Sequence, residues 1–293
     1  MGAADMHGVA WGAASSGTNY YLAAGAGGAL YQSSDGVTTA GLNWSPISGS
    51  GIIANLNAVV YTLNKFIVVG DGGAISSSAD LATWTAGTSI NSQNLNAVAS
   101  NGSRVVAVGN AGTIEYSADG ITWSASAYVP TTNNLYGISY LGSGLWVAVG
   151  AGGTLLTSGD GSTWTAATSG TTADLRGAAF RAATTTTITI PTTTTTTITA
   201  GYVVVGAGGV VLSSPDAVTW ASQTSNITAD LLTVSSLPNQ FLAVGRGGAV
   251  VTSPDGLTWT AQTSGTASAL YGLTTAQGQY VTVGQAGTNL FSR

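Results

Sequence analysis

The sequence predicts an all-β fold, a seven-bladed β-propeller built from four-stranded antiparallel blades. Two repeated features lead to this prediction: a corner motif that ends in Trp, and a Gly-rich turn that follows a β-branched run. The corner motif returns about every 40 residues, and four strands in a unit of that length are typical of a propeller blade. A parallel β-helix, which needs shorter and more uniform coils, is the alternative fold.

The corner motif reads Ser-x-Asp-Gly-x-x-Trp, and its repetition predicts a turn. Successive Asp residues of the motif lie 45, 39, 41, 56 and 39 positions apart. A catalytic centre is needed once, whereas a blade corner is needed in every blade. We therefore expect the Asp to accept backbone N–H bonds, the Gly to adopt a positive φ, and the Trp to be buried between blades. The corner aspartates are Asp35, Asp80, Asp119, Asp160, Asp216 and Asp255.

Four predicted strands fill each unit. An apolar stretch opened by Leu or Met, such as 95–98, comes first, and a run such as 105–109 that ends in Gly follows it. A third run such as 112–117 leads to the corner, and the Trp belongs to the fourth strand. β-Branched residues between Gly, Asp and Ser turns favour antiparallel strands, and no segment has a helical period. Seven Gly-rich turns predict seven blades in one domain spanning 1–293; they begin at Gly25, Gly70, Gly109, Gly150, Gly206, Gly245 and Gly284.

The repeated corner resembles that of the Asp-box (BNR-repeat) propellers. Their box reads Ser-x-Asp-x-Gly-x-x-Trp, and this chain has one residue fewer between Asp and Trp. The superfamily holds sialidases, sortilin-like receptors and the photosystem II assembly factor of cyanobacteria. The resemblance covers almost the whole chain. It implies the propeller fold, and it implies no single function because the superfamily carries out several.

The composition disfavours several classes of function. Only 6% of the residues are charged and the net charge is −5, so a protein that follows nucleic-acid phosphates is not expected. The chain has no Cys, no signal-peptide pattern, and no apolar run of the roughly 18 residues that a membrane span needs. Its surface, rich in Thr, Ser, Gly and Ala, resembles that of phage virion or secreted surface proteins, which predicts a virion or extracellular location.

The ionisable residues supply no expected catalytic site. Six of the eleven acids are corner aspartates, and three more, Asp5, Asp174 and Asp230, precede the opening Leu or Met of a unit. A glycosidase needs two carboxylates that flank one bond. The arginines sit at unrelated positions in the repeat, so no arginine cluster is expected. With one His and no Cys, we expect no metal site, no cofactor and no enzyme activity.

A candidate binding site lies where the repeat varies. The connections between blades share a face with the Gly-rich turns, over the predicted channel. Two sets of positions on this face carry varied side chains: the residue after the opening Leu or Met, and the second residue of the Gly-rich turn. A mixed polar and aromatic rim suits a glycan or a protein surface, and ordinary variation of solvated loops is the alternative. The candidate rim residues are His7, Asn57, Asp71, Asn96, Asn110, Tyr136, Arg176, Arg246, Tyr271 and Gln285.

Two further features predict contacts with a partner. The Thr-rich segment 181–201, with Pro191 near its centre, is expected to form a β-hairpin inserted in blade 5; a low-complexity loop is the alternative. No corner motif follows the seventh Gly-rich turn, so blade 7 is expected to have three strands and an exposed edge. Both features can pair with a strand of a neighbouring subunit or of another protein.

The sequence therefore favours a non-enzymatic binding or structural propeller that engages a protein or a glycan, as a virion component or a secreted surface protein. An assembly chaperone similar to the photosystem II factor is the second hypothesis, and it calls for a clustered basic patch that the sequence does not show. A glycoside hydrolase is the third, and the distribution of the acids disfavours it.

Overall fold

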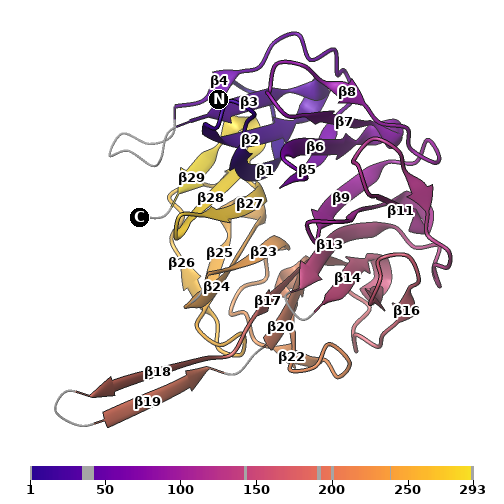
Figure 1. The fold of residues 1–293 in the computed structure, drawn as a ribbon. Coiled ribbons are helices and arrows are strands. Elements are labelled where there is room, and N and C mark those ends of the chain that lie inside the picture. Colours follow the sequence, from indigo (N-terminus) through magenta and orange to yellow (C-terminus); the bar gives the residue numbers. More distant parts are fainter. Residues whose placement is uncertain are drawn as a thin grey trace.

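The computed structural model describes residues 2–34, 43–141, 144–189, 193–198, 201–237 and 239–291. The predicted fold is confirmed: seven antiparallel sheets stand around a central channel as the blades of a propeller (Figure 1). Six blades have four strands, and the seventh has three. Seven short 3₁₀ turns are the helical structure of the described chain, in which no helix is long and apolar enough to cross a membrane.

Each blade adds its strands from the channel outward in sequence order. The inner strands are β1 (Met6–Ala13), β5 (Leu56–Thr62), β9 (Leu95–Ser100), β13 (Leu135–Leu141), β17 (Leu175–Arg181), β23 (Leu231–Leu237) and β27 (Leu270–Ala276). The second strands are β2 (Asn19–Gly25), β6 (Lys65–Gly70), β10 (Val105–Gly109), β14 (Leu145–Gly150), β20 (Gly201–Gly206), β24 (Gln240–Gly245) and β28 (Gln279–Gly284).

The outer strands are shorter. The third strands are β3 (Leu30–Ser33), β7 (Ile75–Ser78), β11 (Ile114–Ser117), β15 (Leu155–Ser158), β21 (Val211–Ser214), β25 (Val250–Ser253) and β29 (Asn289–Phe291). The fourth strands are β4 (Ser45–Pro46), β8 (Thr85–Ala86), β12 (Ser124–Ala125), β16 (Thr165–Ala166), β22 (Ala221–Gln223) and β26 (Thr260–Gln262). In the Thr-rich segment, β18 (Thr184–Thr189) and β19 (Thr193–Ile198) pair with each other as a separate antiparallel sheet that projects from blade 5 (Figure 1).

The turns between second and third strands need glycine for two reasons. They are η1 (Ala26–Gly28), η2 (Asp71–Gly73), η3 (Asn110–Gly112), η4 (Ala151–Gly153), η5 (Ala207–Gly209), η6 (Arg246–Gly248) and η7 (Gln285–Gly287). The last residue of each turn has a positive φ, which is +76° at Gly153. A Cβ on Gly153 would also lie 1.9 Å from the Thr171 carbonyl oxygen. The loop that leaves each of blades 1 to 6 therefore crosses directly over the turn.

The Asp corner is held together by its own side chains. In blade 3, Asp119 Oδ1 accepts the backbone N–H groups of Ile121 and Thr122, both at 2.8 Å, and the Ser117 hydroxyl donates to it at 2.9 Å. Gly120 between them has a φ of +74°. The same pair of N–H bonds is accepted by Asp80, Asp160, Asp216 and Asp255. Asp35 lies outside the described residues.

The hydrophobic core lies between blades. Alternate residues of each second strand face the two neighbouring blades, so both faces of a blade are buried and the strand reads as a continuous apolar run. The corner tryptophans Trp123, Trp164 and Trp259 are at most 6% exposed and belong to clusters that join two blades. The remaining corner tryptophans, which are half-buried, pack against such clusters as well; they are Trp44, Trp84 and Trp220.

One buried carboxylate departs from the repeat. Glu115 in β11 is fully buried, at a position where the next three blades carry an aliphatic residue. Its carboxylate lies 3.0 and 3.2 Å from Ser89 Oγ and accepts the Ile90 N–H at 2.9 Å, in the loop that leaves blade 2. Ser89 Oγ also lies 2.9 Å from the Asn91 carbonyl oxygen. Burial raises the pKa of Glu115, and the hydrogen bonds from Ile90 and Ser89 oppose this shift.

A repeated joint links six of the seven blades to the one before it; blade 7 has Ala269 at this position, which has no side-chain oxygen. The backbone oxygen of Asn94, just before β9, accepts the Asn110 N–H of its own blade at 2.9 Å. The side-chain oxygen of Asn94 accepts the Gly72 N–H of the preceding blade, also at 2.9 Å. Asp5 makes the same side-chain bond to Ala286 of blade 7, at 2.8 Å, and so joins the last blade to the first. The bond recurs at Asn55, Asn134, Asp174 and Asp230.

The corner carboxylates should make stability fall in acid. The backbone N–H groups of Ile121 and Thr122 hold the pKa of Asp119 at about 2. Because this folded-state pKa lies below that of the unfolded chain, the stabilisation is complete above about pH 5 and is lost as the pH falls toward 2. We expect Asp119→Ala to unfold at a lower temperature than wild type at neutral pH, and the difference to shrink below about pH 4. Thermal unfolding followed by circular dichroism tests this, with Asp119→Asn as the non-titrating control; a difference that does not change with pH would contradict it.

Glu115 should have the opposite effect on the pH dependence of stability. Its folded-state pKa is raised, so the ionised form destabilises the fold at neutral pH, and the penalty disappears as the pH falls through that pKa. We expect Glu115→Gln to be more stable than wild type at about pH 8, and this advantage to shrink as the pH falls and to vanish below about pH 4, the ordinary range of an unfolded Glu. Chemical denaturation at a series of pH values measures both curves. A Gln variant that is less stable at high pH would show that the carboxylate is held ionised.

The joint at Asp5 should support closure of the ring. Asp5→Ala removes the acceptor for the Ala286 N–H, and we expect it to lower the free energy of unfolding by about 1 kcal/mol. Asp5→Asn keeps an oxygen at the same place, as Asn55, Asn94 and Asn134 do in other blades, so it should unfold like wild type. Urea titration of the three proteins makes the comparison. Equal losses in both variants would mean that the charge of Asp5 matters more than the hydrogen bond.

Candidate functional site

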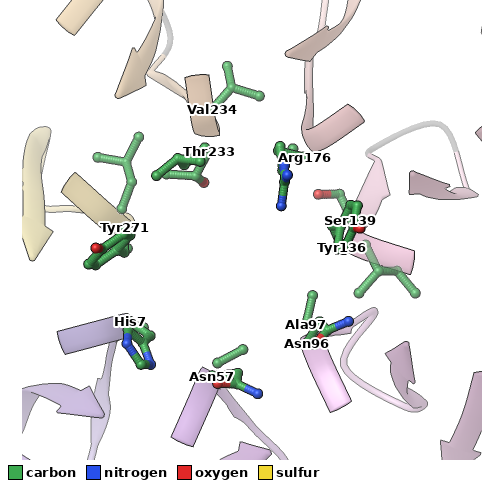
Figure 2. Close-up of a pocket in the computed structure, with 18 of the residues that line it drawn as sticks. His7, Asn57, Asn96, Ala97, Tyr136, Ser139, Arg176, Thr233, Val234 and Tyr271 are labelled. Carbon is green, nitrogen blue, oxygen red and sulfur yellow. The ribbon is translucent and has the colours of Figure 1, made fainter. Parts of the chain in front are cut away.

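The first set of predicted rim positions meets at one mouth of the channel. The residue after the opening Leu or Met of every blade lines a cavity of about 170 Å³ there (Figure 2). In all seven blades the pairing of the inner strand with the second strand slips by one residue at this position. Such a bulge redirects a side chain away from the sheet. The seven residues are His7, Asn57, Asn96, Tyr136, Arg176, Leu232 and Tyr271.

In blades 1 to 3 these side chains are engaged within the ring. Asn57 Nδ2 donates to the Leu95 carbonyl of the next inner strand at 3.0 Å, and to Asp71 Oδ1 at 2.9 Å. Asn96 makes the corresponding bonds to Leu135, at 2.8 Å, and to the side chain of Asn110, at 3.0 Å. His7 Nδ1 lies 3.0 Å from the Leu56 carbonyl oxygen, to which it donates when Nδ1 carries a proton. This half of the rim joins neighbouring inner strands.

The opposite half of the rim carries aromatic rings and a cation. The Arg176 guanidinium lies 4.2 Å above the ring of Tyr136, and its Nη2 donates to Asp174 Oδ2 at 3.1 Å. Arg176 Nε is buried and has no hydrogen-bond partner among the described residues. Tyr271 packs edge-on against His7 with 5.5 Å between ring centroids. Figure 2 shows Arg176, Tyr136 and Tyr271 on the wall of the open mouth.

The second set of predicted positions lies further out, on the turns. Four candidate residues are second in a Gly-rich turn and do not line the cavity; they are Asp71, Asn110, Arg246 and Gln285. Asp71 and Asn110 hold the asparagines of the channel mouth, and Gln285 Oε1 lies 3.4 Å from the Ala269 backbone N of its own blade. The structure therefore brings six of the ten candidate residues together and places the other four around them.

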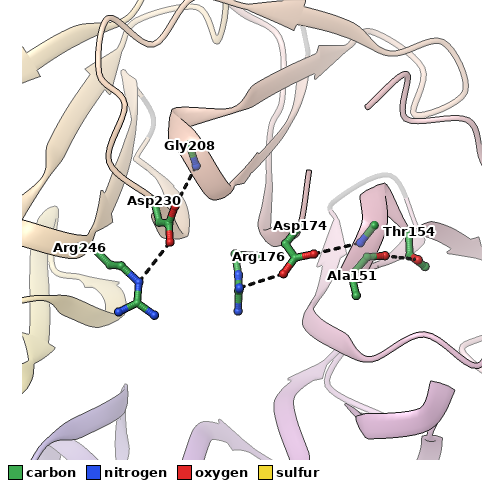
Figure 3. A network of polar contacts seen from close by, with 8 residues as sticks. Ala151, Thr154, Asp174, Arg176, Gly208, Asp230 and Arg246 are labelled. Carbon is green, nitrogen blue, oxygen red and sulfur yellow. Dashed lines mark hydrogen bonds and ion pairs between the residues drawn. The ribbon is translucent and has the colours of Figure 1, made fainter. Parts of the chain in front are cut away.

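Two neighbouring blades repeat one polar arrangement at this face. Asp230 accepts the Gly208 N–H of the preceding blade at 2.8 Å and Arg246 Nε at 3.2 Å, while Asp174 bridges Gly152 and Arg176 in the same way (Figure 3). Each Asp is fixed by the inter-blade joint and in turn orients an Arg. Two cations are thus held at the rim of blades 5 and 6.

The other described basic residues lie at the opposite end of the blades. Lys65 Nζ donates to the Asp119 carbonyl at 3.0 Å, Arg104 donates to that of Asp160, and Arg181 to that of Pro254. Each thereby reaches the Asp corner of the next blade. Arg104 and Arg181 lie at different positions of the repeat, as the sequence indicated, yet they share one structural role with Lys65. The equivalence of Lys65 and Arg104, each just before the apolar run of a second strand, was the signal in the sequence.

The mouth is lined by polar and aromatic side chains. Its lining carries amide, imidazole, phenol, hydroxyl and guanidinium groups and no carboxylate. Among the described residues no three His, Asp or Glu side chains gather where they could hold a metal ion. The rim can therefore donate hydrogen bonds, stack on flat groups and attract negative charge.

Comparison with known proteins identifies the fold alone. No protein-family model matches this chain, and no curated protein is significantly similar to it. YCF48 bound to D1 peptide has a similar structure, with a TM-score of 0.73 and 19% identity over 99% of this chain and 93% of that chain. YCF48 from Cyanidioschyzon merolae gives a TM-score of 0.72 and 17% identity over 99% and 96% of the two chains. The WD40 β-propeller domain of Doa1 gives 0.73 and 10% over 100% and 94%.

Proposed function

We propose that this protein is a non-enzymatic binding propeller that holds an extended segment of a partner protein across the channel mouth. The observation that carries the proposal is the difference between the side chains on the two halves of the rim. In blades 1 to 3 the side-chain donors bond to the next inner strand, whereas on the other side a guanidinium held by Asp174 and two half-buried aromatic rings line the mouth: Arg176, Tyr136 and Tyr271. Aromatic and Arg side chains are the groups that most often anchor a protein interface.

The size and the shape of the mouth favour a peptide segment. A cavity of about 170 Å³ admits one side chain or a turn of chain and excludes a folded domain. The two Arg–Asp pairs beside it extend the polar surface outward over blades 5 and 6. A propeller of similar fold, YCF48, has been solved with a D1 peptide, which supports a peptide as the class of ligand.

The second candidate function is assembly of a larger complex, and the similarity to YCF48 is the observation that favours it. The same surface would then hold one segment of a complex until its other parts arrive. We also infer that the Ser-Asp-Gly-Trp corners are a shortened form of the Asp box, and that the protein works in a virion or outside the cell. A glycan is the alternative ligand for the rim.

Variants of the rim should separate these functions. We expect peptides selected from a random library on the wild-type protein to bind Tyr136→Ala and Arg176→Gln about tenfold or more weakly, because each variant removes one member of the stacked pair. Leu257→Gln, which changes an exposed residue of a corner, is the control and should bind as wild type does. Titration calorimetry measures the affinities.

Other outcomes would replace the proposal. Peptides that bind all three variants equally would place the site elsewhere. Binding to a glycan array in the absence of any peptide ligand would make the rim a carbohydrate site, and hydrolysis of any glycoside would make the protein an enzyme.

A further inference from the structure

Two asparagines of the channel mouth, Asn57 and Asn96, leave only an oxygen for a ligand. A primary amide nitrogen has two protons. Asn57 Nδ2 donates to the Leu95 carbonyl at 3.0 Å and to Asp71 Oδ1 at 2.9 Å, so both of its protons are used. Asn96 Nδ2 makes the corresponding pair of bonds, one of them to the Leu135 carbonyl at 2.8 Å. Because a carbonyl oxygen can only accept, the nitrogen of each side chain must face the ring, and its Oδ1 is left as an acceptor.

Arg176 lies across the mouth from these asparagines and offers donors (Figure 2). Its Nη2 donates to Asp174 Oδ2 at 3.1 Å, and its guanidinium is held 4.2 Å above the ring of Tyr136. A guanidinium has five N–H donors and no acceptor, so most of them have no partner among the described residues. The mouth thus has an acceptor wall, formed by Asn57 and Asn96, and a donor wall, formed by Arg176.

The two walls select among the groups that a partner segment could insert. A carboxylate would bond to the donor wall but would meet the oxygens of the acceptor wall, with the Asp71 carboxylate behind Asn57. An ammonium group would bond to the acceptor wall but would face the Arg176 guanidinium. A hydroxyl has one proton for two oxygens, and an alkyl group would leave both walls unpaired. A primary carboxamide is uncharged and has two N–H donors beside a carbonyl acceptor, so it matches both walls.

The shape of the cavity favours a side-chain amide over a main-chain amide. The inner strands of all seven blades surround the cavity, whose volume is about 170 Å³. A main-chain amide carries residues on both sides and would have to bring both of them between the walls. The amide of a side chain lies at its tip and can enter alone.

We propose that the channel mouth recognises an Asn or Gln side chain of the partner segment, an inference that rests on the proposed function. The carboxamide nitrogen of the ligand donates its two protons to the Oδ1 atoms of Asn57 and Asn96, and its oxygen accepts from Arg176. Tyr136 and Tyr271 lie on the two sides of the mouth between these walls, where their rings contact the flat faces of the amide (Figure 2). Each polar atom of the ligand then meets a partner of the opposite kind.

Peptides selected from a random library on the wild-type protein test this directly. We expect each to contain an Asn or Gln whose replacement by the matching acid, Asp or Glu, weakens binding about tenfold or more in titration calorimetry, because the acid loses the two N–H donors. Replacement by Ala should weaken binding to a similar extent. Peptides that bind equally well with Glu in place of Gln would overturn this inference and leave the proposed function standing. A selection that yields no binding peptide would overturn both.

Variants of the acceptor wall test which residues read the amide. Asn96→Leu removes one oxygen and introduces the residue that blade 6 carries at the same position, Leu232. It should weaken binding of the amide peptide more than that of its acid counterpart, and so reduce the preference between them. Leu257→Gln, an exposed residue of a corner, should keep the full preference. Asn57→Leu replaces Asn96→Leu where circular dichroism shows that the first variant has unfolded.

Two outcomes of this comparison would overturn the inference. A folded variant of the acceptor wall that keeps the full preference for the amide would show that these oxygens do not read it. Competition of the peptide by N-acetylglucosamine, whose acetamido group has the same kind of donor and acceptor, would assign the two walls to a glycan.

Discussion

Burial of each blade against the next is the constraint on which the whole molecule depends. A blade of four short strands cannot bury both of its faces by itself, and its fourth strand has only two or three residues. The corner Trp solves this problem because it carries the largest apolar side chain to the outer edge of the boundary, above the second strand of the preceding blade. Because glycine has no Cβ, the connecting loop can cross close to each Gly-rich turn, and this close approach allows the hydrogen-bonded joint at the channel mouth to form. Apart from the boundary of blades 6 and 7, each boundary is thus closed at its inner end by hydrogen bonds and at its outer end by an indole.

The same constraint explains how few charges the protein uses. The corner aspartates accept two backbone N–H bonds each, and the acids before the inner strands join neighbouring turns. Lys65, Arg104 and Arg181 tie a blade to the corner of the next. Most of the charged groups therefore act as parts of the scaffold, with Glu115 as a buried exception whose pKa is shifted in the opposite direction to those of the corners. The charged side chains that remain to bind a ligand are concentrated around Arg176 and Arg246.

The proposed site at the channel mouth follows from positions that the repeat leaves free to vary. A bulge in every inner strand turns one side chain toward the axis, so a change of that residue alters the surface without altering the sheet. This arrangement suits recognition of varied ligands.

The sequence by itself determined the repeat, the number of blades, the turns and the three-stranded last blade, because each depends on local residue types that recur at a fixed spacing. It also located the seven positions at the channel mouth. Only the tertiary structure decided which of these side chains are already hydrogen-bonded within the protein. Asn57 and Asn96 read as exposed polar residues, yet each bonds to the next inner strand. Nor could the sequence show which second-strand residues each corner Trp buries, since that Trp comes from a neighbouring blade. Contacts between blades join residues about 40 positions apart, and their geometry is set by closure of the ring rather than by local propensity.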